Sequence, residues 1–276
     1  MPTLAPQQFL RDRRATALVE FAWLFPIMML ALFGAYNVSR AANATRELSE
    51  LSDDIAQMLA ETQQSGSPYC TATSPTTCGA LFDYTLKYAY DSAMVEFPEI
   101  LANSNGVASS TIKTPASGGA LTVSMTGVVF AYNSANAGCT APALHACYTG
   151  YVVWTAGAAT RPCGQTYGSG YPNSSPPVTT QLPDALFTPV TNPPGAASAT
   201  SPPLFAVVVD VAYTWKPTLF TGPWFSLIPS ITIARSSYLN PRYVSQLTYY
   251  SQGNGYGTAC GTPSGWSSLP GSPVWP

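Results

Sequence analysis

One apolar stretch, residues 15–36, constrains the fold of this chain more than any other feature. It reads ATALVEFAWLFPIMMLALFGAY, and Glu20 is its single charged residue. At about 1.5 Å per residue, roughly 22 residues make a helix of about 33 Å, which is long enough to cross a hydrocarbon core of about 30 Å. The stretch therefore predicts a membrane-spanning helix over residues 16–36.

The helical pattern continues beyond the apolar stretch. Residues 37–66 contain no proline, and apolar residues recur there at spacings of three and four, at Leu48, Leu51, Ile55, Met58 and Leu59. This pattern predicts one long helix from about residue 16 to about residue 62, with two helices hinged near Asn37 as the alternative. Pro26 is expected to kink the membrane half or to leave one backbone carbonyl unpaired.

A carboxylate inside the apolar stretch needs an explanation. A charge within a membrane segment costs on the order of 2.5 to 3.5 kcal/mol. Glu20 can reach the headgroups from one end of the helix, form a polar contact with another helix, or pair with an amine created by cleavage before Thr16. The residues leave these three explanations open.

The composition favours an exported protein. Charged residues make up 9% of the chain, against about 25% in a typical domain. The net charge is −2 with 11 Lys and Arg residues, which predicts no nucleic-acid partner. The sequence shows no motif of a catalytic triad, a metalloprotease or a phosphate-binding loop, so we expect neither an enzyme nor a cofactor.

All cysteines follow the apolar stretch, which indicates disulfides formed in an oxidising compartment. Among about 15 possible connectivities we favour two local pairs and one long link. The pairs are Cys70–Cys78, Cys139–Cys147 and Cys163–Cys260. A metal site is not expected, because His145 is the only histidine and no C-x2-C spacing occurs.

The remainder of the chain predicts an α+β domain. Residues 81–97 carry a helical apolar stripe, and strands are expected at residues 120–126, 151–154, 204–215 and 230–238. Alternation along them predicts an antiparallel sheet with one face on the long helix and the other toward water. We expect Asp210 on the water-facing side, with a buried polar group at a functional site as the alternative. A Pro/Ser/Thr-rich loop is expected at residues 167–203, and an irregular tail held by Cys260 after residue 252.

The beginning of the chain resembles a known family. The stretch RRATALVEFAWLFPIMMLALFGAY is similar to the start of TadE-like minor pilins, in which an Arg-rich leader precedes a pattern close to G-x-x-x-V-E-F-A-x-x-x-P. Val19, Glu20, Phe21, Ala22 and Pro26 match this pattern. The family usually has glycine where this chain has Ala15. Cleavage before Thr16 is the expectation from the resemblance, and an uncut anchored protein is the alternative.

The resemblance implies a pilin-like fold, in which a long N-terminal helix packs on an antiparallel sheet. It divides the chain into a basic leader (1–15), the helix (16–64) and a disulfide-bonded exported domain (65–276). Arg11, Arg13 and Arg14 precede the helix and predict an N-terminus in the cytoplasm, with the C-terminal domain in the periplasm or outside. The resemblance implies a single-pass protein of the bacterial inner membrane.

The resemblance also implies the partners and the function. The implied partners are other minor pilins, the major pilin, a prepilin peptidase, the inner-membrane pilus platform and membrane lipid. Glu20 and Phe21 would act in pilus assembly. The alternative is an anchored, exported adhesin-like or envelope scaffold protein, and an ordinary secretory signal peptide is the other interpretation of the first 36 or so residues.

Overall fold

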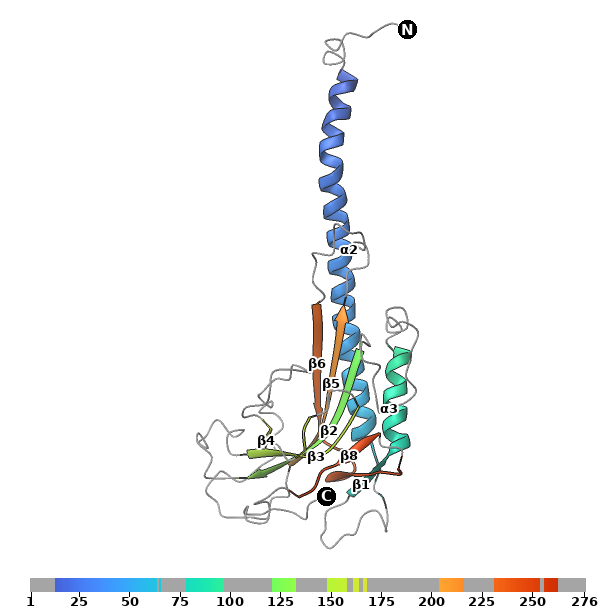
Figure 1. The fold of residues 1–276 in the computed structure, drawn as a ribbon, viewed down its shortest axis with the longest axis vertical. Coiled ribbons are helices and arrows are strands. Elements are labelled where there is room, and N and C mark those ends of the chain that lie inside the picture. Colours follow the sequence, from blue (N-terminus) through green and yellow to red (C-terminus); the bar gives the residue numbers. More distant parts are fainter. Residues whose placement is uncertain are drawn as a thin grey trace. The chain divides into compact units, whose positions relative to one another are not determined.

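The computed structural model describes residues 13–63, 65, 78–96, 121–132, 148–157, 161–163, 166–167, 204–215, 231–253 and 256–262. The chain divides into two compact units, Met1–Ala44 with Trp215–Ile231, and Thr45–Thr214 with Thr232–Pro276. The described elements, in chain order, are α2 (Arg13–Ala60), β1 (Cys78–Phe82), α3 (Asp83–Glu96), β2 (Leu121–Tyr132), β3 (Tyr148–Gly157), β4 (Thr166–Tyr167), β5 (Leu204–Trp215), β6 (Ile231–Leu239), β7 (Gln246–Tyr250) and β8 (Gly257–Ala259). The predicted α+β class is thus present (Figure 1).

The N-terminal helix α2 is continuous over 48 residues. It matches the predicted helix to within a few residues at each end, and no break occurs near Asn37. Pro26 lies inside it, and because proline has no N–H the helix loses one backbone hydrogen bond there. After the helix ends at Ala60, the N–H of Thr62 donates to the carbonyl of Leu59 at 3.2 Å. This bond spans three residues instead of the four of an α-helix, so the chain turns more tightly there.

Residues 45–60 of α2, here called the covered segment, form part of the core of the second unit. Leu48, Leu51, Ile55 and Leu59 repeat every three or four residues and are at most 1% exposed. Polar contacts fix the segment at two points. Arg235 Nε of β6 donates to Ser49 Oγ at 3.2 Å, and the backbone N–H of Arg242 donates to the carbonyl of Ala60 at 2.9 Å.

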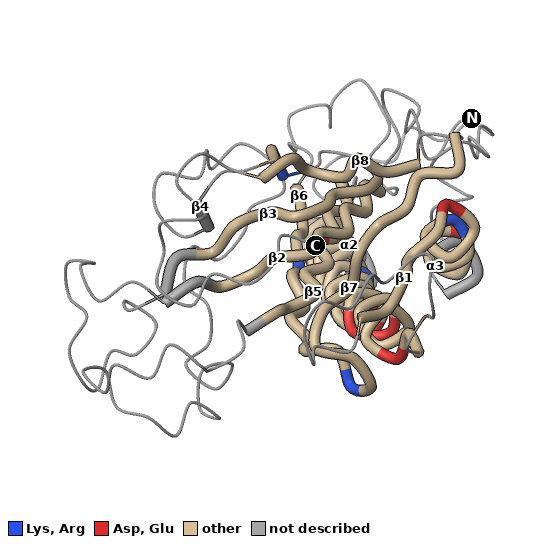
Figure 2. Tube along the Cα trace, turned by 90° about the horizontal axis from the view of Figure 1, so that it is seen from below, with Lys and Arg blue, Asp and Glu red and all other residues tan. Residues whose placement is uncertain are grey.

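The main sheet has the strand order β4-β3-β2-β5-β6, with β8 also paired to β3. Strand β2 is antiparallel to both β3 and β5. Strands β4 and β8 pair with different parts of the same edge of β3, at Gly150 and Tyr151 for β4 and at Trp154–Ala156 for β8. Few charged positions interrupt the described trace (Figure 2).

The expectation that one face of the sheet lies toward water is wrong for its central strands. Every residue of β5 from Phe205 to Tyr213 is buried, and so is nearly all of β2 from Leu121 to Phe130. Alternation in a strand separates the two faces but does not show which of them is covered. Asp210, which we placed on a solvent face, is therefore fully buried.

Two further expectations are corrected. Leu81 and Phe82 belong to β1, not to the predicted helix 81–97, because β1 pairs in parallel with β7. Neither that parallel pair nor strand β7 was predicted. The tail after residue 252 is also not wholly irregular, since β8 joins the edge of β3.

The main sheet is joined to β7 through Trp154. This side chain is 1% exposed, and its Nε1–H donates to the carbonyl of Leu247 at 2.9 Å. Gly127 lies opposite Trp154 on β2, and a Cβ atom added there would collide with the indole ring. Glycine at this position therefore makes room for the tryptophan that links the two sheets.

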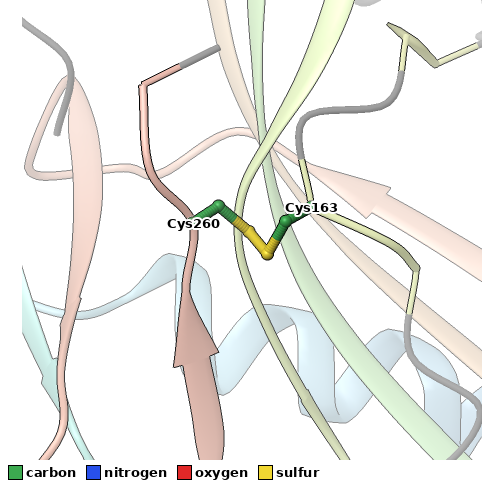
Figure 3. The surroundings of a disulfide bond; sticks show 2 residues. All are labelled: Cys163 and Cys260. Carbon is green, nitrogen blue, oxygen red and sulfur yellow. A yellow bond between two sulfur atoms is a disulfide. The ribbon is translucent and has the colours of Figure 1, made fainter.

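The disulfide between Cys163 and Cys260 closes the second unit (Figure 3). It is the long link that we favoured from the cysteine positions. Cys78 is also disulfide-bonded, and its partner lies outside the described residues. The residues Cys70, Cys139, Cys147 and His145 lie outside the described residues as well, as does most of the predicted loop 167–203.

Candidate functional site

Residues 20–36 of α2, here called the exposed segment, carry large apolar side chains on their outside. Their exposed fractions run from 47% for Phe25 to 77% for Trp23. The whole set is Phe21, Trp23, Leu24, Phe25, Ile27, Met28, Leu30, Leu32 and Tyr36. Soluble proteins rarely leave so much contiguous apolar surface in water. We therefore expect lipid or another protein to cover these side chains.

The exposed segment has the length and composition of a membrane span. The described helix from Glu20 to Ala60 contains an apolar window of 18 residues, of which only 6% are buried in the protein. Such a helix is compatible with a single-pass membrane anchor. A signal sequence close to an N-terminus can have the same length and apolar composition.

Glu20 lies at the start of this segment and is exposed. Within the described residues it forms no ion pair. The neighbouring Phe21 contacts Phe25 one turn later, with ring centroids 5.6 Å apart. The structure thus places Glu20 and Phe21 on an exposed helix surface.

Asn37 marks the other end of the exposed segment. Its side chain is buried, and Nδ2 donates to the carbonyl of Phe33 at 3.0 Å. The Oδ1 atom is also buried and has no hydrogen-bond partner within the described part of the chain. The buried, polar side chain of Asn37 thus lies between the apolar stretch and the amphipathic part of the helix.

Ala15 and Thr16, the residues at the predicted processing position, lie within the backbone of α2, which begins at Arg13. Pro26 lies in the exposed segment. Its missing N–H leaves the backbone carbonyl four residues earlier without its helical hydrogen bond, and in a membrane a neighbouring helix can help to satisfy that carbonyl.

A buried charge cluster in the second unit was missed from the sequence. Arg161 is 1% exposed and forms two hydrogen bonds with Asp210, from Nε to Oδ2 at 2.8 Å and from Nη2 to Oδ1 at 2.9 Å. The hydroxyl of Ser236 donates to the same Oδ1 at 2.7 Å. An Asp within the Val-rich run of β5 was the only available sequence signal, and nothing in the sequence pointed to Arg161 as its partner.

A second polar cluster ties the start of α3 to the C-terminal strands. Asp83 is buried in the first turn of α3, where its charge is favoured by the helix dipole. It accepts hydrogen bonds from the Tyr249 hydroxyl and from the N–H of Gln252, and the Tyr249 oxygen accepts one from Gly257 at 3.1 Å. Burial, together with the bond to Asp83, raises the pKa of Tyr249 to about 12.

In both clusters the carboxylate accepts hydrogen bonds from neighbouring groups of the protein, Asp210 from Arg161 and Ser236, and Asp83 from Tyr249 and Gln252. No group of three or more His, Cys, Asp or Glu that could hold a metal occurs among the described residues. The expectation that the protein is not an enzyme stays a prediction.

Comparison with protein-family models, with curated proteins and with solved structures gives no match to this chain. The exposed segment of α2 is the feature that most clearly requires a partner, and we take it as the candidate functional site.

Proposed function

We propose that this protein is a minor pilin or pseudopilin of a tight-adherence (Tad) pilus. The observation that carries the proposal is the division of α2, a single uninterrupted helix. Its exposed segment presents apolar side chains outward, whereas its covered segment lies in the core of a disulfide-bonded domain. The exposed segment would rest in lipid before assembly and pack against the helices of neighbouring subunits afterwards.

Glu20 has a specific role in this proposal. In an apolar environment its charge would cost on the order of 2.5 to 3.5 kcal/mol, and pairing with a positive group removes most of that cost. Removal of the leader before Thr16 would create an amine on each subunit. The Glu20 carboxylate of one subunit would pair with the amine of its neighbour and fix their relative position along the helix axis.

The cellular setting follows from the same proposal. The protein would be a single-pass protein of the bacterial inner membrane, with its disulfide-bonded domain outside the cytoplasm. A prepilin peptidase would process it, and the pilus platform, the major pilin and other minor pilins would be its partners. The proposal involves no cofactor.

The processing step is tested by mass spectrometry of the N-terminal peptide from sheared pili. We expect a peptide that begins at Thr16. An intact Met1 in assembled material would contradict processing and would favour a permanently anchored protein.

The role of Glu20 is tested by Glu20→Gln, with Glu47→Gln as the matched control on the same helix. We expect Glu20→Gln to reduce incorporation into pili by about tenfold or more, because an unpaired amine would be left in an apolar interface. Its insertion into the membrane should not fall. Glu47 takes part in none of the ion pairs of the described chain, so its substitution should leave assembly unchanged. Normal assembly of the Glu20→Gln protein would remove the proposed pairing.

An anchored adhesin-like protein is the second candidate, and one observation favours it. Tyr84 and Tyr88, one turn apart on α3, are 60% and 71% exposed, and Tyr84 stacks on Phe82 with centroids 5.3 Å apart. Exposed aromatic rings often serve as contact points. If Tyr84→Ser with Tyr88→Ser abolishes surface attachment while pili form normally, adhesion is a function of this domain. Unchanged attachment would disfavour it.

A further inference from the structure

Asp210 places a negative charge at the centre of the sheet. It lies in β5, opposite Ser124 of β2, and its side chain is fully buried. A carboxylate in such a position is strongly destabilising unless a positive group and further hydrogen bonds compensate it. Ser236 supplies one hydrogen bond but no charge. Closure of the sheet around a charged Asp210 is therefore favoured when the guanidinium of Arg161 is in place.

Arg161 is not held by strand pairing. It lies in the short described segment 161–163, which is neither helix nor strand. Two residues further on, Cys163 is bonded to Cys260. Cys260 is itself fixed to β3, because its backbone N–H donates to the carbonyl of Val153 at 2.8 Å and because β8 directly precedes it (Figure 3). The disulfide thus fastens the segment that carries Arg161 to the edge of β3.

We propose that the Cys163–Cys260 disulfide is a redox latch that holds Arg161 on Asp210, so that the sheet closes only after oxidation. Closing the latch forms the Sγ–Sγ bond, and the two thiols lose two protons and two electrons. A disulfide oxidant, such as glutathione disulfide or the disulfide of an oxidoreductase, accepts them and becomes a pair of thiols.

The latch makes folding depend on the compartment. In a reducing cytoplasm the bond to Cys260 does not hold the segment with Arg161, and the charge of Asp210 then opposes closure of the sheet. In an oxidising compartment the bond forms and the compensated pair is buried. This inference goes beyond the proposed function, because it applies to any exported protein with this sheet and does not involve the exposed segment of α2.

The test is a double-mutant cycle between the disulfide and the ion pair in the full-length protein in detergent micelles. The disulfide is removed by Cys163→Ser with Cys260→Ser, which leaves the disulfide of Cys78 intact. The ion pair is removed by Arg161→Met with Asp210→Leu, a replacement that leaves no charge behind. A second neutral pair, Arg161→Gln with Asp210→Asn, guards against poor packing of the first. Denaturant titration followed by tryptophan fluorescence gives the folding equilibrium constant of each protein.

We expect removal of the disulfide to lower the folding equilibrium constant at least about tenfold more in the protein with the Arg161–Asp210 pair than in either neutral-pair protein, since contacting groups couple in such cycles. If the wild-type pair cannot fold without the disulfide whereas a neutral pair can, the latch is supported. Ser236→Ala is the control, because it removes a hydrogen bond from Asp210 without touching Arg161, and the disulfide should matter as much as in the wild type.

An equal loss in the charged-pair and neutral-pair proteins would overturn the proposal. So would failure of all of them to fold without the disulfide. In either case the bond would stabilise the chain by itself, through restriction of the unfolded state, and Arg161 would not depend on it.

Discussion

The exposed and covered segments of α2 belong to the same helix but meet opposite conditions. Both are rich in apolar residues, yet Ile27 is 61% exposed and Ile55 is fully buried. Acidic residues alternate with the apolar ones in the covered segment, whereas the exposed segment contains Glu20 alone. The difference shows that this chain forms a helix in both segments, whether or not the protein itself buries the apolar side chains. The covered segment has its partner within the protein, and the exposed segment needs one from outside.

The strongest way to break this comparison is to place the same charge in each segment. We expect Leu48→Asp to unfold the domain, at a cost above about 4 kcal/mol, because it buries an unpaired carboxylate. Leu30→Asp should leave the free energy of unfolding of the domain unchanged, since Leu30 is 58% exposed. In a membrane, however, it should disfavour insertion by about 2.5 to 3.5 kcal/mol.

The measurements are denaturant titration of the domain and the fraction of protein that stays in membranes after an alkaline carbonate wash. Normal membrane retention of the Leu30→Asp protein would argue against lipid as the environment of the exposed segment. A stable Leu48→Asp domain would show that the covered segment is not part of its core.

Truncation of one residue type in both segments gives a smaller and cleaner contrast. Ile55→Ala should lower the free energy of unfolding by about 2 to 5 kcal/mol, because it removes buried methyl groups and leaves a cavity. Ile27→Ala is the matched control and should change it by less than about 0.5 kcal/mol. Equal effects in denaturant titration would mean that both segments are covered by the protein.

The smallest expected effect is a loss of the free energy of unfolding at high pH, caused by Tyr249 in the domain that covers the helix. The pKa of Tyr249 is raised to about 12 in the folded protein, against a usual value near 10. A raised pKa stabilises the protein below pH 10, and this contribution is lost as the pH rises toward 12. The free energy of unfolding should therefore fall more steeply between pH 10 and pH 12 in the wild type than in Tyr249→Phe. Parallel curves would mean that the pKa of Tyr249 is not raised in the folded protein.

The sequence predicted the local features of this fold and missed the ones that join distant segments. The ends of α2 came within a few residues, because a period of three to four residues is visible in the chain itself. The last two residues of β1, Leu81 and Phe82, were taken for the start of a helix, because they fit a helical stripe and their pairing with β7 is not visible locally. The same reason explains why the tail strand β8 was not expected.

The candidate site shows the same limit. Glu20 and the apolar residues around it were found from the sequence, because a lone charge in an apolar run stands out. Asp210 stood out equally, but its environment was predicted wrongly. Its burial depends on what covers the second face of the sheet and on Arg161, which comes from another segment, and no periodicity within β5 carries that information.

Strands β1 and β7 pair although they lie far apart in the sequence, so β1 is synthesised well before its partner. Residues 78–82 leave the ribosome long before residues 246–250, by roughly ten to thirty seconds at ordinary rates of synthesis. Cys260 follows later still. During this interval α2 is complete, but the strands that finish the domain do not yet exist. The covered segment is therefore synthesised before the last strands of the domain that buries its apolar side chains. Until those strands appear, a membrane or a chaperone would have to shield its apolar residues as well as those of the exposed segment.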